Sequence, residues 1–213
     1  DMHDEISERL GIDAAKQPVP VEPGIHFFMG GIRVDDMHRT NIKGIYAAGE
    51  CASKYHGANR LGGNSMLAAC FGGKTAAGSV MSDPWPSAAD LTGYEDTDEA
   101  GPDGYCEPDI RISRKVRDIL LKGLGIIRNG ALIDEALTEM RALSIEACSD
   151  IDNKRMKLAE AMLMCAGFRK ESRGAHVRSD FPETVEEFKN TTCCRMTGGN
   201  ISINMQEPLK ERF

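Results

Sequence analysis

The stretch HGANRLGGNS, from His56 to Ser65, constrains the fold more than any other part of this chain of 213 residues. It sets glycines, asparagines and one arginine between a β-like segment and the apolar run 66–71. Glycine permits positive φ and close backbone approach, and Asn64 and Ser65 are residue types favoured at a helix N-cap. We therefore predict a turn that leads into a helix over residues 65–80.

The same stretch has the chemistry of an anion site. A helix N-terminus presents free N–H groups and partial positive charge, which suit an anion or an electron-rich oxygen. Arg60 adds a permanent cation whose planar fork matches a carboxylate. We interpret the stretch as an anion site beside a cofactor. From chemistry alone, a capped helix with a surface arginine remains an equal alternative.

Four segments together resemble a known family. Besides HGANRLGGNS they are QPVPV with GIHFFMGG (residues 17–31), GIYAAGE (44–50) and ESRGAH (171–176), in the family's order. The chain is similar to the C-terminal part of the succinate dehydrogenase/fumarate reductase flavoprotein family, which includes L-aspartate oxidases. The resemblance implies an α/β plus α fold: a C-terminal piece of an FAD-binding, Rossmann-like domain followed by a three-helix bundle.

The resemblance also implies a substrate clamp and a ribose contact. His26 and Arg60 match the family's substrate-binding histidine and arginine, and Glu50 matches the glutamate that hydrogen-bonds the ribose of FAD. Taken alone, His26 fits a satisfied core histidine and Glu50 a solvated loop residue.

The cofactor contacts continue into the predicted helix. Asn64, Ser65 and Met66 would open it toward the flavin pyrimidine, with Met66 standing where relatives often carry leucine. No catalytic residue is expected in this chain, because the family's proton-shuttling arginine belongs to an N-terminal region that does not match here. A G-x-G-x-x-G fingerprint after a strand is also lacking.

Charge and cysteine content narrow the function classes. A net charge of −7 argues against nucleic acid and anionic membrane surfaces as partners. An odd number of cysteines without secreted-type spacing indicates reduced thiols in the cytoplasm, and we expect no metal site at Cys193-Cys194. We find no signal peptide and no apolar run near about 18 residues. Any membrane association is expected to be peripheral, on the inner face through partner subunits.

Periodicity predicts the remaining organisation. We expect a helix within 1–16, strands at 25–29, 32–34 and 42–48, and a hairpin over 191–205 around Gly198-Gly199. Three apolar stripes between 108 and 172 predict helices, the third of them marked by Leu158, Met162, Cys165 and Ala166. The predicted domains are the end of a capping-domain region (1–23), an FAD-domain piece (24–82), a linker (83–107), a helical bundle (108–172) and a tail (173–213).

The predicted function is that of an FAD-dependent enzyme that interconverts succinate and fumarate, although this chain alone is incomplete. The predicted partners are a small dicarboxylate substrate, the N-terminal remainder of the flavoprotein and an iron–sulfur electron-transfer subunit. L-aspartate oxidase, or another flavin-dependent double-bond reductase, is one alternative. A non-catalytic fragment that needs an N-terminal partner chain is the other.

Overall fold

The structure, a computed structural model, describes residues 2–21, 24–87, 107–143 and 149–207. Most of the predicted linker 83–107 lies outside these ranges. In chain order the elements are α1 (Met2–Leu10), β1 (Ile32–Arg33), η1 (Gly49–Cys51), β2 (Ala52–Ser53), α2 (Asn64–Ser82), α3 (Ile110–Leu124), β3 (Ile127–Arg128), α4 (Gly130–Leu143), α5 (Asp150–Phe168), β4 (Val177–Arg178), η4 (Glu186–Phe188), β5 (Thr191–Thr197) and β6 (Asn200–Gln206).

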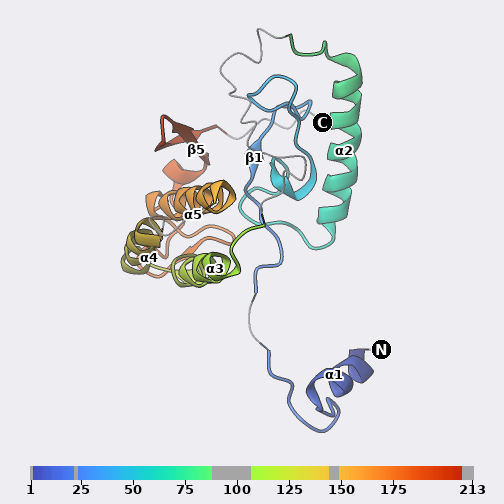
Figure 1. The fold of residues 1–213 in the computed structure, drawn as a ribbon, viewed down its shortest axis with the longest axis vertical. Coiled ribbons are helices and arrows are strands. Elements are labelled where there is room, and N and C mark those ends of the chain that lie inside the picture. Colours follow the sequence, from blue (N-terminus) through green and yellow to red (C-terminus); the bar gives the residue numbers. More distant parts are fainter. Residues whose placement is uncertain (1, 22–23, 88–106, 144–148, 208–213) are drawn as a thin grey trace.

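The N-terminal helix α1 lies apart from the other helices (Figure 1). None of its residues is buried, and it ends before Gly11, whose φ is 65°. The helix expected within 1–16 is therefore present, but it covers only Met2–Leu10, about two and a half turns.

The β structure of residues 24–53 is smaller than the sequence predicts. The strands expected at 25–29 and 42–48 are wrong: residues 24–31 form no strand, and Tyr46 makes only an isolated bridge with Arg39. The strand β1 pairs instead in parallel with β2, with Ile32 opposite Ala52. Apolar runs become strands only beside a partner strand, and the described residues supply none for these two segments.

Helix α2 confirms the predicted helix, but its start differs in detail. Its N-cap is Gly63, at φ 81°, with no side-chain cap, whereas Asn64 and Ser65 are already helical. The N-cap role predicted for those two residues is wrong, because glycine adopts the left-handed conformation that this entry requires. The helix packs on η1, where Ala69 lies against Gly49.

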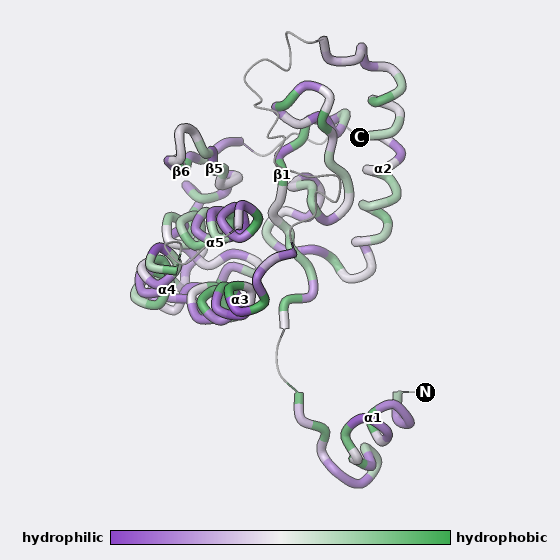
Figure 2. The backbone as a smooth tube through the Cα atoms, in the orientation of Figure 1, coloured by the Kyte–Doolittle hydropathy of each residue, from purple (hydrophilic) through white to green (hydrophobic). Residues whose placement is uncertain are grey.

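Helix α2 is apolar over most of its length (Figure 2). Large apolar side chains on it are nevertheless exposed, namely Met66, Leu67, Phe71, Val80 and Met81. An all-round apolar helix is normally buried in a larger protein. The described residues thus leave one of its faces without the cover that such a helix usually has.

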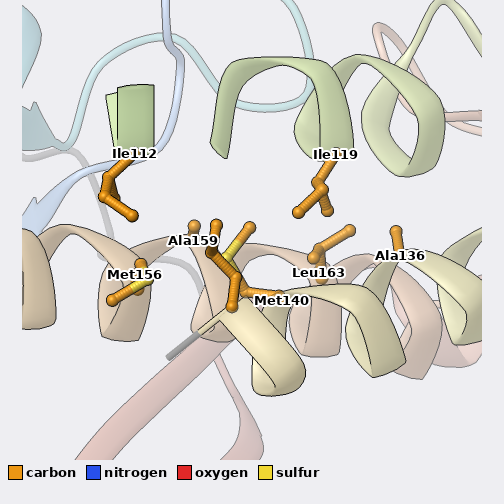
Figure 3. Close-up of a cluster of buried hydrophobic side chains, with 8 residues drawn as sticks. Ile112, Ile119, Ala136, Met140, Met156, Ala159 and Leu163 are labelled. Carbon is orange, nitrogen blue, oxygen red and sulfur yellow. The ribbon is translucent and has the colours of Figure 1, made fainter. Parts of the chain in front are cut away.

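Helices α3, α4 and α5 pack on one another around a shared apolar core. Figure 3 shows side chains from all three helices pointing toward one another. The members of the core are Ile112, Ile119, Ala136, Met140, Leu143, Met156, Ala159 and Leu163. On α5 the predicted stripe is displaced: Leu158 is 64% exposed and Leu163 is fully buried.

The C-terminal hairpin matches the prediction. Strands β5 and β6 pair antiparallel from Thr191 opposite Gln206 to Thr197 opposite Asn200. Gly198 and Gly199 form the two-residue turn, both with positive φ, as a type I′ turn requires. Among the described residues, none of the helices has both the length and the apolar character that crossing a membrane requires.

Candidate functional site

Arg60 lies in the loop before α2 and rests on an aromatic ring. Its guanidinium carbon is 4.6 Å from the centre of the Phe27 ring, and its Nη1 donates to the Leu61 carbonyl at 3.3 Å. Its Nε is buried and has no hydrogen-bond partner within the described ranges. Arg60 is thus oriented by a cation–π contact and not neutralised by a carboxylate of the described chain.

Two histidines flank this contact. The His56 ring packs edge-on against Phe27, with ring centres 5.1 Å apart. Burial, and then the charge of Arg60, lower the pKa of His56, which keeps the imidazole neutral near neutral pH. His26 is exposed and precedes Phe27 in the chain. The structure therefore brings Phe27, which the sequence reasoning missed, into contact with Arg60, and leaves His26 as its sequence neighbour.

Glu50 belongs to η1 and is tied to the segment that carries His26. Its Oε1 accepts a 2.9 Å hydrogen bond from the Phe28 amide. Its other oxygen has no partner among the described residues, and the side chain is exposed. Gly31 lies so close to the Cys51 carbonyl that a Cβ would overlap it. One carboxylate oxygen therefore fixes the side chain, and the other remains able to accept from a ligand hydroxyl.

The start of α2 offers further hydrogen-bond donors. The Asn64 amide donates to the Leu61 carbonyl at 3.2 Å. The amides of Ser65 and Met66 lie in the first turn, where a helix supplies no acceptor, and no side chain caps them. Together with Arg60 they form a positive end suited to an electron-rich group.

A loop from the C-terminal part of the chain reaches this site. The Ala175 amide donates to the Ala58 carbonyl at 3.0 Å. Gly174, at φ 58°, lies so close to Ala58 that a Cβ would overlap the carbonyl. The two blocks HGANR and ESRGAH, remote in sequence, therefore meet through their backbones.

A buried ion network supports that loop. Glu171 is fully buried and pairs with Arg169 at 2.8 Å and with Arg173 at 3.0 Å. Burial opposes the charged form, but hydrogen bonds from Arg173, the Val185 amide and Arg169 outweigh it and lower the pKa of Glu171. This network holds the 171–176 segment beside Ala58.

His38 holds Tyr55, the residue that directly precedes the HGANRLGGNS stretch. It is fully buried, with φ 61°, and its ring nitrogens lie 2.7 Å from the Ala47 carbonyl and 2.5 Å from the Tyr55 hydroxyl. The role of His38 was missed in the sequence analysis, although a histidine within the polar turn 35–41 could have indicated it.

No group of three or more histidine, cysteine, aspartate or glutamate side chains in the described part of the chain could hold a metal ion.

Comparison with known proteins decides the family. Residues 1–66 match the family model of an FAD-binding domain, and residues 153–211 match that of the C-terminal region of fumarate reductase flavoproteins. L-aspartate oxidase of Pyrococcus furiosus is 38% identical over 88% of the chain, and one chain of the CoM/CoB fumarate reductase of Methanothermobacter marburgensis is 33% identical over 85%. The chain belongs to the succinate dehydrogenase/fumarate reductase flavoprotein family. Its cofactor is FAD.

Solved structures agree with this assignment. The FrdA chain of Escherichia coli quinol fumarate reductase matches the whole chain with a TM-score of 0.78 at 26% identity. The Sdh1 complex of Mycobacterium smegmatis matches with a TM-score of 0.73 at 29% identity. The fold is therefore an FAD-binding-domain fragment followed by a C-terminal helical domain.

This flavoprotein chain is shorter than these relatives. It spans 37% of each of the two curated relatives named above and 42% of the E. coli flavoprotein chain. The FAD-binding match covers His26, Glu50, Arg60 and the first residues of α2. An exposed carboxylate oxygen, uncapped helix amides and an unneutralised arginine fit one end of such a cofactor and an adjacent anion.

Proposed function

We propose that this chain supplies the substrate clamp and one end of the FAD site in an enzyme that interconverts succinate and fumarate. The observation that carries the proposal is the Arg60 guanidinium, oriented by Phe27 and not paired with a carboxylate in the described ranges. A guanidinium in this state can grip a carboxylate through two parallel hydrogen bonds.

Each residue has a defined task in this proposal. Arg60 and His26 bind the two ends of a C4 dicarboxylate, and Phe27 keeps the guanidinium from rotating. Glu50 accepts from the ribose, while the Ser65 and Met66 amides stabilise negative charge at the end of α2. Bound FAD supplies the hydride donor or acceptor. Rate enhancement by these residues then comes from positioning and charge stabilisation.

Oxidation of L-aspartate is the second candidate, and the relatives favour it. Several curated relatives, including that of Pyrococcus furiosus, are named L-aspartate oxidases. Both substrates carry two carboxylates, so Arg60 suits either. Aspartate also carries an ammonium group, which needs a hydrogen-bond acceptor in the site. Within the described residues, the polar contact of Arg60 is to one acceptor alone, the Leu61 carbonyl.

The remainder of the flavoprotein is proposed to complete the site. The exposed apolar residues of α2 form a face of the kind that packs inside a larger domain, which supports an N-terminal partner segment. An iron–sulfur protein as the electron partner and a cytoplasmic location stay predictions.

Anaerobic flavin spectroscopy on the full-length protein tests the proposal. Succinate should bleach the flavin absorbance, and fumarate should restore it after chemical reduction. Bleaching by L-aspartate without any response to succinate would select the second candidate. A flavin that responds to neither substrate would overturn both enzymatic assignments.

The isolated chain tests the remaining hypothesis, that of a non-catalytic fragment that needs an N-terminal partner chain. After desalting, we expect it to retain little FAD, whereas the full-length protein should retain the cofactor. Stoichiometric FAD on the isolated chain would show that the clamp segment is sufficient and that the predicted need for an N-terminal partner is wrong.

A further inference from the structure

Two cysteines outside the flavin site meet where the C-terminal hairpin packs on α5. Cys165 lies in the last turn of α5 and is partly buried, and Cys194 lies in β5 and is exposed. Both are free thiols, and α5 contacts both strands of the hairpin. Figure 1 shows β5 beside α5.

One ion–dipole anchor sets the register between helix and strand. Arg169, just after α5, donates from Nη1 to the Thr192 hydroxyl at 2.7 Å and to the Asn190 carbonyl at 3.1 Å. Cys165 precedes Arg169 by one helical turn, and Cys194 follows Thr192 on the same face of β5. One turn rises about 5.4 Å and two strand residues about 6.8 Å. Because these steps are similar in length, a strand that runs back along the helix from the Arg169–Thr192 bond reaches the level of Cys165 at Cys194.

Strand pairing places Cys194 on the face of the hairpin that meets α5. Its register partner is Ile203 of β6, and Ile203 lines one hollow with Met164 of α5. Burial, followed by the nearby Cys194, raises the pKa of Cys165. Cys193 is the adjacent residue in β5, so its side chain points to the other face of the strand. The geometry therefore singles out one pair from the three cysteines in this region.

We propose that Cys165 and Cys194 form a reversible disulfide that staples the C-terminal hairpin to α5, with a peroxide as the oxidant. Exposure assigns the first step to Cys194 and leaves Cys165 as the resolving thiol. The proposal does not depend on the function proposed for the flavin site.

The reaction balances as two steps. The Cys194 thiol releases its proton, and the thiolate attacks one peroxide oxygen as the O–O bond breaks. The departing hydroxide takes up that proton and leaves as the first water, and Cys194 becomes a sulfenic acid. The Cys165 sulfur then attacks the Cys194 sulfur, the S–S bond forms, and the S–O bond breaks. The departing hydroxide takes the Cys165 proton and leaves as the second water. Two thiols lose two electrons and two protons, and the peroxide is reduced to two waters.

Peptide mapping under non-reducing conditions tests this assignment in the full-length, FAD-loaded protein. The native protein is treated with hydrogen peroxide, its remaining thiols are alkylated in acid-quenched denaturant, and the digest is analysed by mass spectrometry. We expect a cross-linked peptide pair joining Cys165 to Cys194, which disappears after treatment with a thiol reductant. Cys51 and Cys70, both exposed, should remain free of disulfides and serve as internal controls.

Neighbouring cysteines give the matched variants. Cys193→Ser should form the same cross-link at an undiminished yield, whereas Cys194→Ser should lose it entirely. A vicinal Cys193–Cys194 link, or a link from Cys165 to Cys193, would overturn the assignment. Complete alkylation of both thiols after peroxide treatment would overturn it as well. Circular dichroism of each variant before oxidation verifies that it has folded.

Discussion

The amide of Ala175 donates a 3.0 Å hydrogen bond to the carbonyl of Ala58, and this bond joins the helical domain to the loop that carries Arg60. The neighbouring Gly174 has φ 58° and lies against Ala58 without space for a side chain. Backbone geometry, and not side-chain chemistry, therefore couples the two parts of the chain at the candidate site.

Substitution of Gly174 by alanine should displace this contact. The new Cβ would overlap the Ala58 carbonyl, and the left-handed backbone would add about 1–2 kcal/mol of strain. We expect a lower urea midpoint and weaker FAD retention in the full-length protein, because the loop must move away from Ala58.

Gly198→Ala is the matched control. Gly198 has nearly the same φ, 56°, but no atom lies within 4 Å of its added Cβ. It should lose stability from strain alone and keep its FAD. Equal FAD loss in the two variants would show that the Ala58 contact has no special role.

Arg60→Lys should reduce activity strongly although it keeps the charge. Lysine cannot make the bidentate grip or stack flat on Phe27, and one lost charge-assisted hydrogen bond costs about 1.5–3 kcal/mol, roughly ten- to a hundredfold in rate. Steady-state kinetics with the dicarboxylate measure the effect. Arg117→Lys, at an exposed ion pair on α3, should leave the rate unchanged. Near-wild-type kinetics in Arg60→Lys would remove Arg60 from the site.

Local patterns predicted much of this structure, and contacts between distant segments account for most of what they missed. The helix over 65–80 and the hairpin turn at Gly198-Gly199 follow from periodicity and turn chemistry. The contact of Phe27 with Arg60 and that of Ala58 with Ala175 join segments that no local pattern links. The strand predicted at 25–29 was wrong because strand formation depends on a neighbour that the segment itself does not specify.

Two leucines of α5 distinguish the apolar face predicted from the sequence from the face that is buried in the structure. Leu163 is fully buried in the core, so Leu163→Ala should cost about 2–5 kcal/mol through lost burial and the cavity left behind. Leu158 is 64% exposed, so Leu158→Ala should change stability by less than about 0.5 kcal/mol. Urea unfolding of both variants measures the difference. Equal losses of stability in the two variants would support the apolar stripe predicted from the sequence.

Asp83 should make stability depend on pH in the acid range. Arg39 donates to it twice, at 2.5 and 2.6 Å, and Tyr46 donates at 2.8 Å. Hydrogen bonding by Arg39, then by Tyr46, lowers the pKa of Asp83 to about 2. Because the folded-state pKa lies below the unfolded value of about 3.9, the stabilisation is complete above that value and is lost as the pH falls through the folded-state pKa.

The measurement is the difference in urea midpoint between wild type and Asp83→Asn across this range. It should be constant near neutral pH and shrink as the solution becomes more acidic than pH about 4. Asp118→Asn, which removes an exposed carboxylate beside Arg117, should show a small difference at every pH. A difference for Asp83→Asn that survives full acidification would contradict the role assigned to the ion pair.

The start of α2 gives the last prediction, which concerns the reduction potential of the bound flavin. Met66→Pro deletes an amide that has no acceptor within the helix, at a position where the first turn tolerates proline. If this amide stabilises negative charge on the cofactor, its loss is worth about 1.5–3 kcal/mol, or roughly 30–60 mV for a two-electron couple. Redox titration of the full-length protein, after its FAD content is verified, should therefore give a lower potential. Ser65→Ala is the control, and it should leave the potential unchanged because Gly63 is the N-cap and the Ser65 side chain does not cap the helix. An unchanged potential in Met66→Pro, with FAD retained, would mean that α2 does not serve the cofactor.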